Sequence, residues 1–443
     1  MATPSLAVPL SAGAPAPTPV PVPSSALADL AILTVAAVAA RLAFGWILPP
    51  EAFSYDLRTW PRVAGLLREG LHPYISSDIM AWPPFWMQFV YLFDHLAALL
   101  GVPLFRVIQA FLTSVEVATM AILYGALVNR FALPRTAVRR TLLVGIALNP
   151  MIIMLNCQHG NFDSIVGFWV LLAVLMVCRF MQHGERADWL LACMMLGLGI
   201  LTKTTPLVLV PLLFFGFRRL LLIDKICGAL LVFGPVVLAV SVLYVVWPTQ
   251  ITTKVLGYRS APGWFGITGL LQLAGASRLY AIYPKIYPAL MLIALAATSV
   301  WVLHIRRASQ PKVVLVAAVL LAAVPGFGPG YGSQYVEWFY PLWVMVYALS
   351  NRAGRRLLFA CFAIAVVTYA MEYAFVPSHG AFLRSFFDAR WIVRWSGALS
   401  SQSSETLLRL PLFACYLAAL GFGVASLRRR VTPMDLGTSA LVL

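Results

Sequence analysis

Side chains that can act as bases, cations or hydrogen-bond donors gather in short polar segments between long apolar runs. In the first of these segments, Asp56 follows an apolar run and precedes a helix whose first turn suits Pro61. Val63, Leu66 and Leu67 make that helix amphipathic, which is typical of a helix lying at a membrane interface. A carboxylate at this depth could serve as a general base. The alternative is that Asp56 only caps the helix.

A second polar segment forms a short turn between two apolar runs. It contains Gln158, His159, Asn161 and Asp163, which are more polar side chains than a simple connector between two helices needs. This pattern indicates a turn that faces a ligand, although Asn161 or Asp163 could instead cap the next helix. A zinc site at His159 is disfavoured, because no second His or Cys lies at ligand spacing.

Cationic side chains stand in two further segments. Lys203 ends an apolar run, where a lysine is costly unless it snorkels to the interface or pairs with an anion. Tyr258 and Arg259 lie in a Gly-rich loop and could present two donors to a phosphate. These positions predict a phosphate-binding site, with His159 as a further candidate ligand.

The last segment, in which Gln334, Tyr335 and Trp338 begin an apolar run, is a candidate substrate-binding element. An aromatic belt at the membrane interface is the alternative for its rings. Glu116 lies in the middle of an apolar run, where it is either structurally paired or a buried neutral acid. The sequence leaves its role, and that of Arg41, open.

The composition determines the class of protein that must position these residues. Of 443 residues, 61% are hydrophobic and 11% are charged, whereas soluble domains carry about 25% charged residues. Apolar runs of ~17–25 residues recur along the chain, which predicts an all-α polytopic membrane protein. The net charge of +16 fits basic loops on the cytoplasmic side, so no nucleic-acid partner is expected.

Charge distribution predicts the topology. If 83–100 lies flat at the interface, eighteen of the 32 basic residues fall in short cytoplasmic loops. Both termini are then cytoplasmic, and the polar segments face outward. The chain is expected to be a multi-pass protein of the plasma membrane with about twelve spans, at 27–48, 104–128, 140–156, 162–180, 187–203, 205–221, 226–246, 284–305, 312–327, 335–350, 356–376 and 407–427.

The expected organisation has two membrane modules between two tails. Residues 1–26 form a disordered cytoplasmic tail, and 429–443 form a second cytoplasmic tail. Residues 27–246 form a catalytic module that includes the outer loop 49–103. Residues 247–428 form the second module, with outer loops at 247–283, 328–334 and 377–406.

The order of the polar segments resembles the GT-C superfamily of polyprenyl-phosphate-sugar-dependent glycosyltransferases. The resemblance covers most of residues 27–345. Its elements are an acid after the first helix, a "G-x-P-Y" end to an interfacial helix, a "PP" segment, an "H-G-x-F/N" turn, a "K-x-x-P" element and a "Q-Y-x-x-W…P" element. They match Asp56, Gly70 to Tyr74, Pro83-Pro84, His159 to Asp163, Lys203 to Pro206, and Gln334 to Trp338 with Pro341. The elements look most like bacterial mannosyltransferases, with some likeness to dolichyl-phosphate-glucose glucosyltransferases.

The resemblance implies a GT-C-type helical bundle with interfacial helices in its first outer loop. It also implies an inverting enzyme that transfers a hexose, mannose or glucose, from a polyprenyl phosphate to a lipid-linked or glycan acceptor outside the membrane. Asp56 is the expected base, with Asp163 and then Glu51 as competitors. Lys203, Arg259 and His159 are expected at the donor phosphate. The expected substrate-binding residues are Tyr55, Arg58, Tyr74, Gln158, Asn161, Asp163, Tyr258, Gln334, Tyr335 and Trp338.

No cofactor is expected, because the donor has no nucleotide diphosphate that a metal must hold, although a divalent cation remains an open alternative. The expected partners are the lipid donor, the acceptor and membrane lipids, and the protein is expected to be a monomer. A carrier or flippase for lipid-linked sugars is the alternative function. It would expose polar sites to both sides of the membrane, whereas the polar segments here are predicted on one side.

Overall fold

The computed structural model describes residues 24–48, 53–76, 83–256, 266–305, 308–330, 332–375 and 401–428, with isolated positions between 390 and 398. Over these residues the chain forms helices and no β-strand, which confirms the predicted all-α class. Arg259, Tyr258 and Glu51 lie outside the described residues.

The first half of the bundle runs from α1 to α9. Its elements are α1 Ser24–Ile47, α2 Tyr55–Arg68, α3 Pro73–Ser76, α4 Phe85–Leu100, α5 Leu104–Gly125, η2 Ala126–Arg130, α6 Arg135–Leu142, η3 Leu143–Ala147, α7 Pro150–Met154, η4 Leu155–His159, α8 Asp163–His183 and α9 Arg186–Thr202. The elements that follow are η5 Thr205–Phe214, η6 Phe217–Arg219, α10 Leu222–Val246, α11 Pro248–Gln250, η7 Ile251–Leu256, α12 Gly266–Leu273, α13 Ser277–His304, α14 Gln310–Phe327, η8 Ser333–Trp338, α15 Tyr340–Leu349, α16 Arg352–Phe375 and α19 Gln402–Arg428.

Eight of the described helices are long and apolar enough to cross a membrane, or nine if one bent pair counts as a single span. The chain is therefore a multi-pass membrane protein, but the predicted count of about twelve is not confirmed. The bent pair joins Arg135–Ala147 to Pro150–His159 at an angle of 43°, where a single span over 140–156 was expected. Pro150 lacks the N–H that would continue the first helix, so the break falls there.

Two other predicted spans are occupied by shorter helices. The 205–221 span is replaced by η5, a 3₁₀-helix of 10 residues that contains Pro206 and Pro211. Two prolines remove two backbone donors, which disfavours a continuous α-helix. The 335–350 span is divided between η8 and α15. In contrast, α9 Arg186–Thr202 matches the predicted span 187–203 within one residue and has 17 residues, the lower bound for a crossing.

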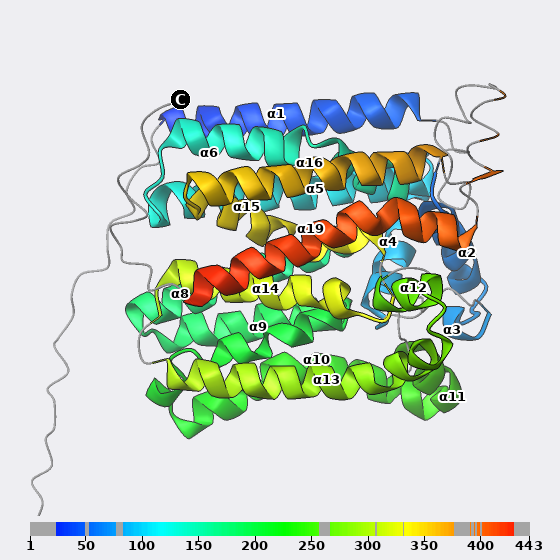
Figure 1. The fold of residues 1–443 in the computed structure, drawn as a ribbon. Helices are drawn as coiled ribbons and strands as arrows, with labels where there is room; N and C mark the ends of the chain where they lie inside the picture. The colour runs from blue at the N-terminus through cyan, green and yellow to red at the C-terminus, as the bar shows by residue number, and fades with distance from the viewer. Residues whose placement is uncertain are drawn as a thin grey trace, which may run out of the picture.

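The long helices run roughly along one axis, and the two ends of the bundle differ in character (Figure 1). The junctions α8–α9, α13–α14 and α15–α16, which carry predicted cytoplasmic basic residues, lie at one end (Figure 1). Helices α2, α3, α4 and α12 lie at the other end (Figure 1). Helix α4 has 16 residues, or ~24 Å at 1.5 Å per residue, which is shorter than the ~30 Å hydrocarbon core. Its length fits the prediction that 83–100 does not cross.

The predicted sidedness can be measured by cysteine labelling from outside the cell. Single cysteines at Ser76 and Ser260 are expected to react with an impermeant reagent, because they belong to predicted outer segments. Cysteines at Ala137 and Ala308 are expected to react only after the membrane is opened, since basic loops remain in the cytoplasm. A background variant without the six native cysteines serves as the control. Labelling of Ala137→Cys in sealed cells would invert the topology.

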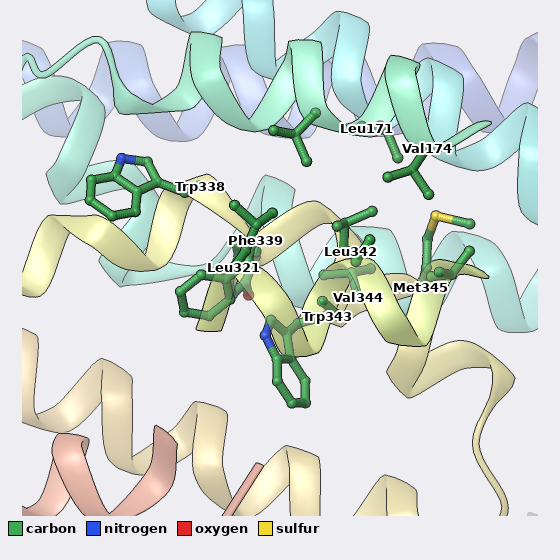
Figure 2. Packing of buried hydrophobic residues seen from close by; sticks show 14 of the residues in the cluster. Leu171, Val174, Leu321, Trp338, Phe339, Leu342, Trp343, Val344 and Met345 are labelled. Atoms are coloured by element: carbon green, nitrogen blue, oxygen red, sulfur yellow. The ribbon is translucent and has the colours of Figure 1, made fainter. Parts of the chain in front are cut away.

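The bundle core is built where α15 packs between α8 and α14. Figure 2 shows Leu342 and Met345 of α15 directed toward Leu171 and Val174 of α8, whereas Trp343 points away from α8. All five side chains are buried, at 5% exposed or less. This contact fixes η8, the segment just before α15, against the start of α8.

Arg41 and Glu116, whose roles the sequence left open, form a buried ion pair between α1 and α5. Arg41 Nε donates to Glu116 Oε2 at 2.7 Å, and the guanidinium also donates to the Ala147 carbonyl at 2.8 Å. The two residues are 3% and 5% exposed. The geometry favours the structural pairing, because a buried charge needs a partner of opposite sign.

Candidate active site

Asp56 lies inside the first turn of α2, which begins at Tyr55 rather than at the predicted Pro61. The prediction was wrong because the chain accommodates Pro61 inside the helix, where one backbone hydrogen bond is lost. The Asp56 carboxylate does not cap α2. Its Oδ2 lies 2.7 Å from Nε2 of His159 and accepts a hydrogen bond from Asn161 Nδ2 at 2.9 Å.

The two donors hold only one oxygen of the carboxylate. Among the described residues, no side chain or amide donates to Oδ1 of Asp56. The side chain is 15% exposed, so the carboxylate is shielded but still accessible. An anchored carboxylate with one open oxygen has the geometry that a general base requires.

Three hydrogen bonds fasten the start of α2 to the polar turn between η4 and α8. The Ser54 amide donates to the Gln158 carbonyl at 2.9 Å, and the Ser54 hydroxyl donates to the His159 carbonyl at 3.1 Å. Trp60 Nε1 donates to the Gly160 carbonyl at 2.9 Å. These bonds hold the turn against the helix, which places His159 and Asn161 on Asp56.

Gly160 is required at this junction for two reasons. Its φ of +61° is in the left-handed region, which side chains rarely adopt. A Cβ atom at Gly160 would also lie 2.3 Å from Leu57 Cδ1, so α2 could not pack so closely. The glycine of the predicted "H-G" pair is thus required because α2 packs directly against the turn.

His159 has both ring nitrogens occupied. Nε2 faces Asp56, and Nδ1 contacts the hydroxyl of Tyr373 and lies 3.2 Å from the hydroxyl of Tyr369. The two tyrosine rings, both on α16, stack with their centroids 4.3 Å apart. His159 is 4% exposed, so its surroundings support a role in holding Asp56 better than the predicted role at the phosphate.

Lys203 lies in a closed cage. Its Nζ is 2.6 Å from Asp163 Oδ1, and the rings of Phe162, Tyr335 and Trp338 surround it at 5.5, 5.0 and 4.8 Å. Lys203 and Asp163 are 5% and 0% exposed. We refer to these five residues as the Lys203 cage. The cage already supplies Lys203 with an anion, so the geometry favours pairing over both snorkelling and an open phosphate site.

The cage also changes the interpretation of three other predicted residues. Asp163 faces Lys203 and does not cap α8, and its ion pair with Lys203 favours Asp56 as the base. Tyr335 and Trp338 stack on each other at 4.1 Å and are 7% and 3% exposed. Their rings therefore contact the lysine rather than an open substrate surface.

The remaining predicted substrate residues are distributed over three environments. Tyr55 and Arg58 are exposed on α2, and Gln334 is half-buried in η8. Gln158 and Tyr74 are 0% exposed. Burial raises the pKa of Tyr74, so its phenol stays protonated and cannot act as a base. Their roles in substrate binding stay predictions.

Several residues of the site were not predicted. Tyr369 and Tyr373 lie four positions apart in an apolar span, a spacing that puts both on one helical face. Glu337 is 3% exposed, and neither of its carboxyl oxygens has a hydrogen-bond partner among the described residues. An intramembrane acid is a functional candidate by default, so Glu337 in the "Q-Y-x-x-W" segment could have been singled out.

Within the described part of the chain, no group of three His, Cys, Asp or Glu side chains is placed to hold a metal ion.

Residues 84–253 match the family model of the dolichyl-phosphate-mannose-protein mannosyltransferases. This stretch includes α4, the polar turn and Lys203. The match confirms the resemblance to GT-C glycosyltransferases that the polar segments predicted, and it identifies a glycosyltransferase.

Among solved structures, the chain is similar to the crystal structure of ArnT from Cupriavidus metallidurans bound to undecaprenyl phosphate. The two share 15% sequence identity with a TM-score of 0.49, over 90% of this chain and 77% of that chain. No curated protein matches the chain.

Proposed function

We propose that this glycosyltransferase moves a hexose from a polyprenyl phosphate to a hydroxyl of a lipid-linked or glycan acceptor at the outer face of the membrane. The observation that carries the proposal is Asp56, held by His159 and Asn161 through one oxygen while the other stays open. The family model matched by residues 84–253 is that of enzymes named for a dolichyl-phosphate-mannose donor, which supports a polyprenyl-phosphate sugar.

The proposed step is a single displacement. The oxygen of the acceptor hydroxyl attacks the anomeric carbon of the sugar. At the same time, Oδ1 of Asp56 accepts the proton of that hydroxyl. The bond from that carbon to the phosphate oxygen breaks on the opposite face, and its electron pair leaves with the polyprenyl phosphate. The configuration is therefore inverted, as in other displacements that use one base and no covalent intermediate.

The departing phosphate requires a cation or several donors. Arg259 and Tyr258 remain the predicted ligands, although they lie outside the described residues. Lys203 remains a competing ligand only if a donor phosphate can replace Asp163 as its anion. The exposed Arg58, two positions after Asp56, is a further candidate within α2.

Transfer assays with purified protein in lipid nanodiscs test the proposal. Polyprenyl-phosphate mannose and polyprenyl-phosphate glucose are offered separately, together with membrane glycolipid acceptors, and nucleotide sugars serve as the negative control. We expect transfer from a polyprenyl-phosphate hexose and none from a nucleotide sugar. Movement of the labelled lipid across sealed vesicles without transfer would instead establish a flippase.

A further inference from the structure

We infer that His159 is a neutral positioning residue whose proton is held on Nε2 by Tyr369 and Tyr373, and that this tautomer orients Asp56. The inference rests on the proposed function, because it assigns Asp56 the role of base. It adds two residues, Tyr369 and Tyr373, to that function and assigns the proton of His159. It also extends the catalytic machinery from the first outer loop to α16, late in the chain.

The position of the proton follows from what each partner can do. A carboxylate only accepts hydrogen bonds, so the 2.7 Å contact between Nε2 and Asp56 Oδ2 requires a proton on Nε2. A neutral imidazole carries one proton, which leaves a lone pair on Nδ1. That lone pair faces the hydroxyls of Tyr373 and Tyr369, both of which can donate.

The tyrosine pair can satisfy the lone pair that a neutral ring leaves on Nδ1. The Tyr373 hydroxyl contacts Nδ1 and the Tyr369 hydroxyl lies 3.2 Å from it, so each can donate to that lone pair. A proton on Nδ1 would instead require one of these hydroxyls to accept. The adjacent acid on α16, Glu372, is occupied by Arg409, whose Nε donates to it at 2.8 Å. Among the described residues, the carboxylate that contacts the His159 ring is therefore that of Asp56, and the contact is at Nε2.

The tautomer matters because it determines where the open oxygen points. With the proton on Nε2, His159 and Asn161 hold Oδ2 from two directions, and Oδ1 stays available. With the proton on Nδ1, a lone pair on Nε2 would face a lone pair of the carboxylate. Asp56 would then rotate away from the turn. Hydrogen-bond partners on the far ring nitrogen fix the tautomer of a functional histidine in many enzymes.

Nitrogen-15 NMR of histidine-labelled protein in lipid tests the tautomer directly and needs no transfer activity. The six histidines are separated by comparison with the variant His159→Gln. At neutral pH we expect His159 to show one protonated nitrogen, Nε2, and one unprotonated nitrogen, Nδ1. Protonation of both nitrogens, or of Nδ1 alone, would overturn the inference whatever the enzyme transfers.

Two substitutions of His159 test the positioning role. His159→Gln keeps a donor near the Nε2 position, whereas His159→Asn places its amide near the Nδ1 position. We expect kcat to fall by only about 3-fold for the first and by about 100-fold for the second, with KM nearly unchanged in both. Equal losses in both variants, or a loss in KM alone, would contradict positioning through Nε2.

The tyrosines have a matched control in the same bundle. Tyr373→Phe is expected to lower kcat by about 3–10-fold and to mix the His159 tautomers in the NMR spectrum. Tyr340→Phe removes another buried hydroxyl, one that accepts from Asn149 at 2.6 Å and donates to the Gly145 carbonyl, and should leave kcat unchanged. If Tyr373→Phe left both the tautomer and kcat as in the parent, α16 would have no part in the site.

Discussion

Asp56→Asn is expected to reduce sugar transfer by roughly 10²–10⁴-fold while the protein still inserts into the membrane and binds its donor. Asparagine keeps the size of the side chain and an oxygen that can accept from Asn161. It removes the negative charge and the basicity that the acceptor proton requires. The measurement is the initial rate of transfer in nanodiscs, with donor binding measured separately on the same preparation.

Asp94 provides the control for this substitution. It lies on α4, at the same end of the bundle, and pairs with the exposed Arg68 at 3.4 Å. The Asp94 side chain is 13% exposed, but its partner Arg68 is 58% exposed, so the pair contributes ~1 kcal/mol or less and Asp94→Asn should retain nearly full transfer. Near-normal transfer by Asp56→Asn would remove Asp56 as the base. Asp163, the predicted competitor, would then have to release Lys203 in order to act.

Lys203→Met is expected to lower the free energy of unfolding by about 3–5 kcal/mol, because it leaves the Asp163 carboxylate buried without its cation. The double variant Lys203→Met with Asp163→Asn should recover much of this loss, since no unpaired charge remains. Thermal unfolding in a single detergent measures both. The lipid donor is left out of this measurement, so a role of Lys203 in binding the donor does not affect the measured free energy of unfolding.

Lys312 is the matched control for the cage. It also lies over an aromatic ring, that of Trp301 at 5.5 Å, but it is only partly buried. Lys312→Met should therefore change the free energy of unfolding by about 1 kcal/mol or less. If Lys203→Met unfolded normally but lost 10–100-fold in donor affinity, Lys203 would be the phosphate ligand that the sequence predicted.

The sequence by itself determined the membrane class, the approximate position of the helices and the segments that carry chemistry. Long apolar runs have one stable solution in a bilayer, because a helix satisfies its own backbone groups. Seven of the eight long spans in the structure accordingly lie within four residues of predicted ones at each end, and the eighth, Ser277–His304, begins seven residues before the predicted 284–305. The resemblance of the polar segments correctly indicated a glycosyltransferase. The division into two modules, the sidedness and the roles at the phosphate stay predictions.

Only the tertiary structure decided which polar groups meet. Asp56 and His159 are 103 residues apart, and Tyr373 is 214 residues from His159. The pairing of Lys203 with Asp163 likewise depends on the packing of α8 against α9. Residue types and local spacing report the face of a helix and the ends of a span. They do not report which faces come together, because that is set by the packing of side chains between helices distant in the chain.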